Sequence, residues 1–100
     1  MKRIYKYPIL CTDIVACQEI EMHADAGILS AGRDPNGDMC IWAMIEDTNP
    51  MVKKNIYCVG TGWPLNLIFT NNKVINFIDT IKEGPYMWHL FYGEDQYDNE

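Results

Sequence analysis

Residues 27–46 have the sequence GILSAGRDPNGDMCIWAMIE, and this stretch predicts a β-hairpin more strongly than any other part of the chain predicts a local structure. In its middle, Pro35 presets the backbone for the second turn position, Asn36 suits the third, and Gly37 accepts the left-handed conformation that follows. The second flanking run, residues 39–46, is apolar on both faces. This pattern is typical of a strand that is covered on both sides near the middle of a domain.

The rest of the chain repeats this rhythm of short apolar runs separated by turn residues. Four runs favour strands: residues 3–7, 17–22, 53–59 and 86–92. In residues 17–22 the side chains alternate in character between two faces, as in a strand with one face exposed to water. Residues 73–82 fit both a helix and a strand, and their valine and isoleucine content favours the strand.

These patterns predict a mainly β protein of six to seven strands, either a small antiparallel sandwich or a partly open barrel. One short helix within residues 66–82 remains the alternative for the ambiguous stretch. One hundred residues are enough for a single domain, which we assign to residues 1–92. Residues 93–100 are polar and acidic without apolar periodicity, so we expect a flexible tail there.

The composition disfavours some partners and locations. With 14 Asp and Glu against 8 Lys and Arg, the formal net charge is −6, which disfavours direct binding to the phosphates of DNA. No signal peptide is evident, and no apolar run approaches the roughly 18–20 residues that span a bilayer. The four cysteines lack Cys-x-x-Cys spacing, which indicates buried thiols in a reducing cytoplasm.

The residue types that carry most enzyme chemistry are scarce. Ser30 is the only serine, and no nucleophile-elbow pattern surrounds it. The only histidines are His23, which fits a surface loop, and His89, which fits either a packed core position or a ligand-facing one. We therefore expect a protein that is not an enzyme, with no catalytic residues, no metal site and no cofactor.

The segment Gly60-Thr61-Gly62-Trp63 is the strongest candidate for a binding site. The two glycines allow successive backbone N–H groups to point into one concavity that holds an anion. Thr61 adds a hydroxyl group, and Trp63 adds a flat face that stacks on a base or ring, so the segment suits a nucleotide-like ligand. A strand-ending turn without a ligand is the alternative interpretation.

Four further residues are expected to complete this site. Trp42 offers a second stacking surface, Lys53 and Lys54 offer positive charge for a phosphate, and His89 is the ligand-facing candidate. The chain also has three tryptophans, six tyrosines and six methionines, which are many for so small a core. Some of these large side chains must be exposed, and we expect a homo-oligomer or a partner-binding surface.

Three motifs carry a resemblance to a known family: MKRIYKYP at residues 1–8, VGTGWP at residues 59–64 and WHLF at residues 88–91. Over most of its length the chain resembles a family of small uncharacterised tailed-bacteriophage proteins. Members of that family often have histidine where Trp63 stands here, and the family has no established activity or catalytic residues. The resemblance implies a phage or prophage gene whose product acts in the bacterial host cytoplasm.

Together these observations lead us to expect a phage-encoded accessory binding protein. Its most specific form is a counter-defence protein that sequesters a nucleotide signal. One alternative is a protein–protein inhibitor that turns its acidic faces and an exposed sheet edge toward a host factor. Another is a small virion or assembly component for which oligomerisation is the function.

Overall fold

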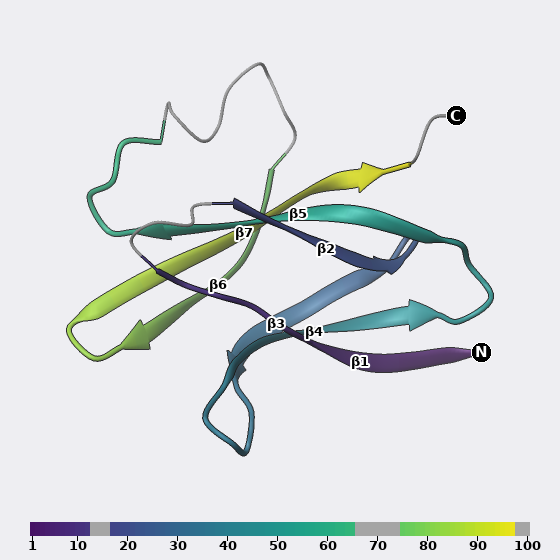
Figure 1. Cartoon of the computed structure of the whole chain (residues 1–100), viewed down its shortest axis with the longest axis horizontal. Coiled ribbons are helices and arrows are strands. Elements are labelled where there is room, and N and C mark those ends of the chain that lie inside the picture. The colour runs from purple at the N-terminus through teal and green to yellow at the C-terminus, as the bar shows by residue number, and fades with distance from the viewer. Residues whose placement is uncertain (13–16, 66–74, 98–100) are drawn as a thin grey trace.

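The computed structural model describes residues 1–12, 17–65 and 75–97, in which it contains seven β-strands and no helix (Figure 1). The strands are β1 (Lys2–Pro8), β2 (Cys17–His23), β3 (Gly27–Arg33), β4 (Met39–Glu46), β5 (Met51–Gly60), β6 (Asn76–Glu83) and β7 (Tyr86–Gln96). The mainly β prediction is therefore confirmed, and most of the ambiguous stretch is strand. The helix alternative for residues 66–74 lies outside the described residues.

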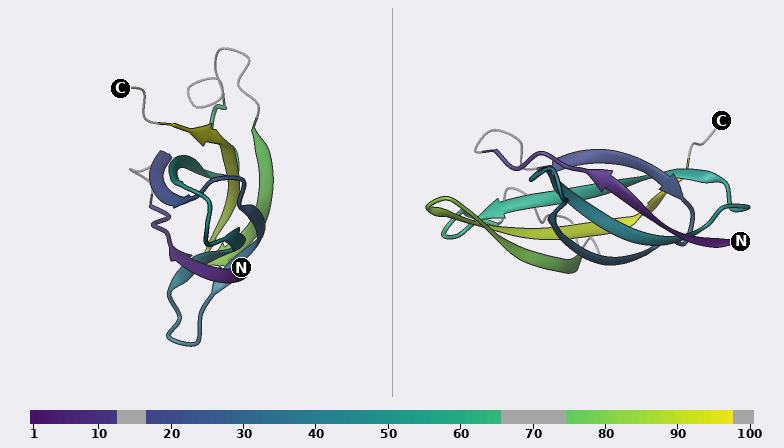
Figure 2. Two further views of the ribbon diagram at one scale, coloured as in Figure 1. Left: turned by 90° about the vertical axis from the view of Figure 1, so that its right-hand side faces the viewer. Right: turned by 90° about the horizontal axis from the view of Figure 1, so that it is seen from below.

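The strands form two antiparallel sheets that pack face to face in a flat molecule of 40 × 37 × 18 Å (Figure 2). One sheet has three strands in the order β1-β4-β3, and the other has four in the order β2-β5-β7-β6. β4 is the middle strand of its sheet, as its two-sided apolar pattern predicts. No described segment forms a helix able to cross a membrane.

Single contacts, rather than continuous ladders, join the edges of the two sheets. Leu10, which follows β1, is held by the side-chain amide of Gln18 on β2: its N–H donates to Oε1 at 3.1 Å, and its carbonyl accepts from Nε2 at 2.7 Å. On the opposite side, Asp79 of β6 accepts a hydrogen bond from the N–H of Ala31 on β3 at 3.3 Å. The fold is therefore a sandwich and not a closed barrel.

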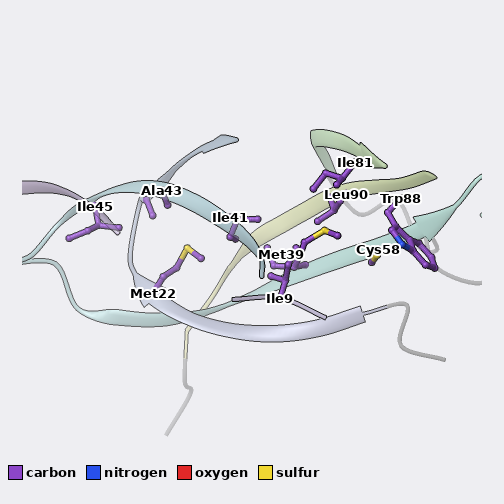
Figure 3. Packing of buried hydrophobic residues seen from close by; sticks show 12 residues of the cluster. Ile9, Met22, Met39, Ile41, Ala43, Ile45, Cys58, Ile81, Trp88 and Leu90 are labelled. Atoms are coloured by element: carbon purple, nitrogen blue, oxygen red, sulfur yellow. The ribbon is translucent and has the colours of Figure 1, made fainter. Parts of the chain in front are cut away.

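The core lies between the sheets. The inward-facing residues of β4, which alternate from Met39 to Ile45, are buried. They face a four-stranded sheet in which Cys58 of β5 and Leu90 of β7 are directly opposed and both fully buried. Trp88 lies beyond Cys58 at one end of this core (Figure 3). The core therefore extends to the end of the sheet at which β7 begins.

The hairpin loop between β3 and β4 is organised by Asp34. One carboxylate oxygen accepts hydrogen bonds from the backbone N–H groups of Asn36 and Asp38, each at 2.9 Å. The other accepts from Lys6 Nζ at 2.8 Å, which ties the loop to β1. The Lys6 ammonium and the two N–H groups hold the pKa of Asp34 below its ordinary value.

We predict that acid weakens the fold through Asp34. Because the pKa of this carboxyl is lower in the folded chain than in the unfolded chain, its charge stabilises the fold above the ordinary carboxyl pKa of about 4. That contribution is lost as the pH falls through the lowered folded pKa. Asp34→Asn should thus be less stable than the wild type at neutral pH and should approach it in acid, as measured by urea unfolding across the pH range.

Asp38→Asn is the control, since it removes the same charge from an exposed position in the same loop. A stability difference between the wild type and Asp34→Asn that stays constant with pH would contradict the prediction.

The sequence predicts a flexible tail at residues 93–100, but residues 93–96 belong to β7. Asp95 is directly opposite Lys54, and its Oδ1 lies 2.8 Å from Lys54 Nζ. The two side chains are only 13% and 5% exposed, and the ammonium also lies 5.1 Å from the centre of the Tyr92 ring. A buried charge pair thus orders a segment whose local sequence is polar. Residues 98–100 lie outside the described residues.

We predict that Lys54→Met costs about 3 kcal/mol of unfolding free energy, because it leaves the Asp95 carboxylate buried without its counter-ion. Lys53→Met is the matched control: Lys53 faces Glu19 across 3.8 Å in an exposed pair, and exposed pairs contribute at most about 1 kcal/mol. Chemical denaturation of both variants measures the difference. Equal losses of stability would show that the buried pair does not hold the end of β7.

Candidate functional site

A pocket lies at one end of the molecule, where the ends of β1, β5 and β6 meet the start of β7 (left side of Figure 1). Its volume is about 570 Å³. Its lining residues are Cys11, Thr12, Gly60, Thr61, Trp63, Glu83, Pro85, Tyr86, Met87 and Trp88. A concave site of this size that is lined by aromatic side chains and a few polar groups is typical of small-molecule binding.

Gly60 allows Trp63 to fold back over the end of β5. The Trp63 N–H donates to the Gly60 carbonyl at 3.1 Å, which closes a turn in which Gly62 has φ +88°. The indole lies so close to Gly60 that a Cβ there would be 2.8 Å from Trp63 Nε1. Any side chain at position 60 would therefore displace the indole.

Trp88 is the surface on which Trp63 packs. Gly60 and Trp88 are directly opposed in the β5–β7 ladder. The Trp63 and Trp88 ring centroids are 5.6 Å apart with an interplanar angle of 84°, and Tyr86 stacks on Trp88 at 5.9 Å and 24°. Trp88 is buried, Trp63 is half-buried and Tyr86 is 61% exposed. Trp63 and Trp88 therefore pack edge to face, and the ring surface that remains exposed belongs to Trp63 and Tyr86.

Glu83 is the one acidic or basic residue among the described residues that line the pocket. Its Oε1 accepts a hydrogen bond from Trp88 Nε1 at 3.1 Å, and its Oε2 accepts from Arg33 Nη2 at 3.2 Å. The two-residue turn at Gly84 and Pro85, with φ +55° at Gly84, places Glu83 directly opposite Tyr86. Arg33 lines an adjoining groove of about 350 Å³ and does not line the pocket itself.

His89 fixes Thr61 at the pocket rim. Its Nε2 lies 2.7 Å from Thr61 Oγ1, and its Nδ1 lies 3.1 Å from Thr80 Oγ1. Both ring nitrogens therefore have hydroxyl partners, and His89 is not among the residues that line the pocket. The structure thus gives His89 a hydrogen-bonded position that connects the turn after β5 to β6.

Cys11 lies beside Cys58 where the pocket meets the adjoining groove. A hydrogen bond between the two thiols lowers the pKa of Cys11 and raises that of Cys58. The expectation of buried thiols is confirmed for Cys40 and Cys58, whereas Cys11 is half-buried and Cys17 is exposed. In the described part of the chain, no group of three or more His, Cys, Asp or Glu side chains is arranged to hold a metal ion.

The structure brings together part of the site expected from the sequence. Gly60, Thr61 and Trp63 line the pocket, Gly62 completes the turn, and His89 contacts Thr61. One of the amides in the expected anion-binding concavity is engaged elsewhere, because the Trp63 N–H donates to the Gly60 carbonyl.

The other expected residues lie away from the pocket. Trp42 is on the outward face of β4 in the opposite sheet, while its neighbours Ile41 and Ala43 point into the core. Lys53 and Lys54 are at the far end of β5, about 20 Å from Gly60 at the rise per residue of a strand. Neither the second stacking surface nor the lysine charges reach the pocket.

Four further pocket residues, Trp88, Tyr86, Glu83 and Cys11, were not predicted from the sequence as part of the site. For three of them a signal was available in residues 83–88, which have the sequence EGPYMW. A Gly-Pro turn with glycine at its first central position favours a two-residue hairpin. Such a hairpin sets Glu83 opposite Tyr86, and Trp88 then follows on the same face of the strand.

Fold and pocket together define a small two-sheet β protein with a concave aromatic site at one end. The chain belongs to the family described as Domain of unknown function (DUF7352), whose model matches residues 1–100. Neither a curated protein nor a solved structure matches it significantly.

We predict that Gly60→Ala opens the pocket by displacing the Trp63 indole, because the added methyl group would overlap the ring. The near-ultraviolet circular dichroism of the Trp63–Trp88 pair should decrease while the far-ultraviolet spectrum of the sheets is retained. Gly32→Ala is the matched control: it also places a methyl group beside an indole, but at an ordinary 3.7 Å from Trp42 Cζ3. A near-ultraviolet spectrum unchanged by Gly60→Ala would contradict this packing.

Proposed function

We propose that this chain is a binding protein, not an enzyme, and that it holds a planar, nucleoside-like ring in the aromatic pocket. The observation that carries the proposal is the pair of side chains Trp63 and Tyr86, which pack on the buried Trp88 and keep ring surface exposed at the pocket. A flat ring that enters the pocket covers aromatic surface, and stacking of a base on an aromatic side chain contributes about 1–3 kcal/mol. Tyr86, at 61% exposed, has surface left to cover.

Two polar groups at the pocket suit the edge of a base. The Thr61 hydroxyl lines the pocket and is oriented by His89, and the Glu83 carboxylate is oriented by Trp88 and Arg33. Small-molecule sites commonly combine apolar walls with a few such fixed polar groups, which set orientation and specificity. The described lining residues include neither lysine nor arginine. A nucleotide would therefore enter base first, with its phosphates outside the pocket.

The resemblance to tailed-phage proteins favours a role in counter-defence, in which the protein removes a nucleotide signal from the cytoplasm of the infected host. Sequestration requires only binding, so the proposed site is complete without a nucleophile or a general base.

We predict that Trp63→Ala weakens the binding of nucleosides by at least about tenfold, because it removes one of the two side chains that keep ring surface exposed at the pocket. Trp42→Ala is the matched control, since it removes a half-buried tryptophan from the opposite sheet, away from the pocket. Titration of adenosine, guanosine, cytidine and uridine by isothermal calorimetry measures both. The proposal fails if no nucleoside binds or if the two variants lose affinity equally.

A second candidate function is inhibition of a host protein. Leu10, Tyr86 and Met87 line the pocket or the adjoining groove and are 65%, 61% and 41% exposed. Exposed aromatic and methionine side chains around a pocket are typical of interfaces. Native mass spectrometry of protein purified from phage-infected cells separates the candidates. A bound nucleotide favours sequestration, a stoichiometric host protein favours inhibition, and self-assembly alone favours an oligomeric structural role.

A further inference from the structure

The charge of the pocket restricts its ligand. Among the described residues that line it, Glu83 is the one residue that is Asp, Glu, Lys or Arg. The adjoining groove adds Arg33 and Asp38, so pocket and groove together hold two carboxylates and one guanidinium. The chain as a whole carries a formal charge of −6. At the position of the inserted ring, both the local and the overall charge therefore favour a cation over an anion.

The aromatic side chains of the pocket also favour a cation. The faces of tryptophan and tyrosine rings carry negative electrostatic potential, and a cation within about 6 Å of a ring centre is attracted to them. Trp63 and Trp88 stand at 84° to each other, and Tyr86 is nearly parallel to Trp88. The exposed ring surface of Trp63 and Tyr86 and the Glu83 carboxylate beside Trp88 supply the ring faces and the negative charge that attract an organic cation.

We infer that the pocket selects a ligand whose inserted end is an organic cation, in particular a base that carries positive charge on its ring. This inference rests on the proposed function and specifies its ligand class. A charged base keeps the stacking surface of a neutral one and adds attraction to the ring faces and to Glu83. An N-alkylated purine or a pyridinium ring meets both requirements.

The positive charge of Arg33 weakens the attraction between Glu83 and a cationic ligand. Removing that charge therefore tests the inference. Its guanidinium lies 3.2 Å from Glu83 Oε2 but does not line the pocket. The pair is 40% exposed on both sides, so its own contribution to stability is small. Replacing Arg33 by an uncharged side chain leaves the Glu83 charge uncompensated. A cationic ligand should then bind more tightly, whereas a purely structural role of Arg33 would weaken binding or leave it unchanged.

The experiment compares two isomers with the full-length protein by isothermal calorimetry at neutral pH. 1-Methyladenosine binds a proton and is a cation at neutral pH, whereas its isomer N6-methyladenosine stays neutral, so the two ligands differ in the position of one methyl group and in that proton. We expect the cationic isomer to bind about tenfold more tightly. Glu83→Gln should remove most of this preference, and it retains an oxygen that can accept the Trp88 Nε1 hydrogen bond. Arg33→Met should increase affinity for the cationic isomer several-fold and leave the neutral isomer unaffected.

The outcomes separate this inference from the function on which it rests. Equal binding of the two isomers would overturn the cation preference and leave the ring-binding function intact. Binding of neither isomer would contradict both. A preference for the cation that survives in Glu83→Gln and does not grow in Arg33→Met would overturn the role of Glu83. Far-ultraviolet circular dichroism of both variants checks that they retain the fold.

Discussion

The pairing of β5 with β7 is the constraint on which the rest of the structure depends. Both strands lie inside the four-stranded sheet, and their ladder runs from Lys53 opposite Gln96 to Gly60 opposite Trp88. At one end the buried Lys54–Asp95 pair fixes the alignment of the strands. At the other end, beyond a one-residue shift in register, Gly60 lies opposite Trp88, and the missing side chain of Gly60 leaves room for the Trp63 indole that packs on Trp88. The pocket lies at the Gly60–Trp88 end of this ladder.

A shift of one residue within this ladder decides which side chain enters the pocket. The register changes between Lys54 and Ile56, where β7 contributes one residue more than β5. If the alignment at Lys54–Asp95 continued unchanged, His89 would be opposite Gly60. Because successive side chains of a strand point to opposite faces, Trp88 would then leave the core side. The irregularity therefore places the Trp88 indole on the core side of the sheet. His89 then lies on the other face, where it contacts the Thr61 hydroxyl.

This dependence on register explains what the sequence predicted and what it did not. Local signals identified the β3–β4 hairpin, the strands and the Gly60–Trp63 turn, because turn residues and apolar alternation act over a few positions. Asp95 appeared to belong to a polar tail because its partner is far away in the sequence. Trp88 and Glu83 were not assigned to the site for the same reason. A bulge has no clear sequence signature, so the contacts that depend on it could not be predicted.

The charge of the site follows from the same geometry. The sequence places two lysines on the strand that ends at Gly60, and this arrangement suggested phosphate as the ligand. In the fold the length of β5 separates the lysines from the pocket, and Lys54 is neutralised by Asp95. Glu83 is far from Gly60 in sequence, yet it reaches the pocket through the two-residue turn before β7. Interactions between exposed charges decay within about 10 Å at moderate salt, so the nearest carboxylate governs the ligand more than the distant lysines do.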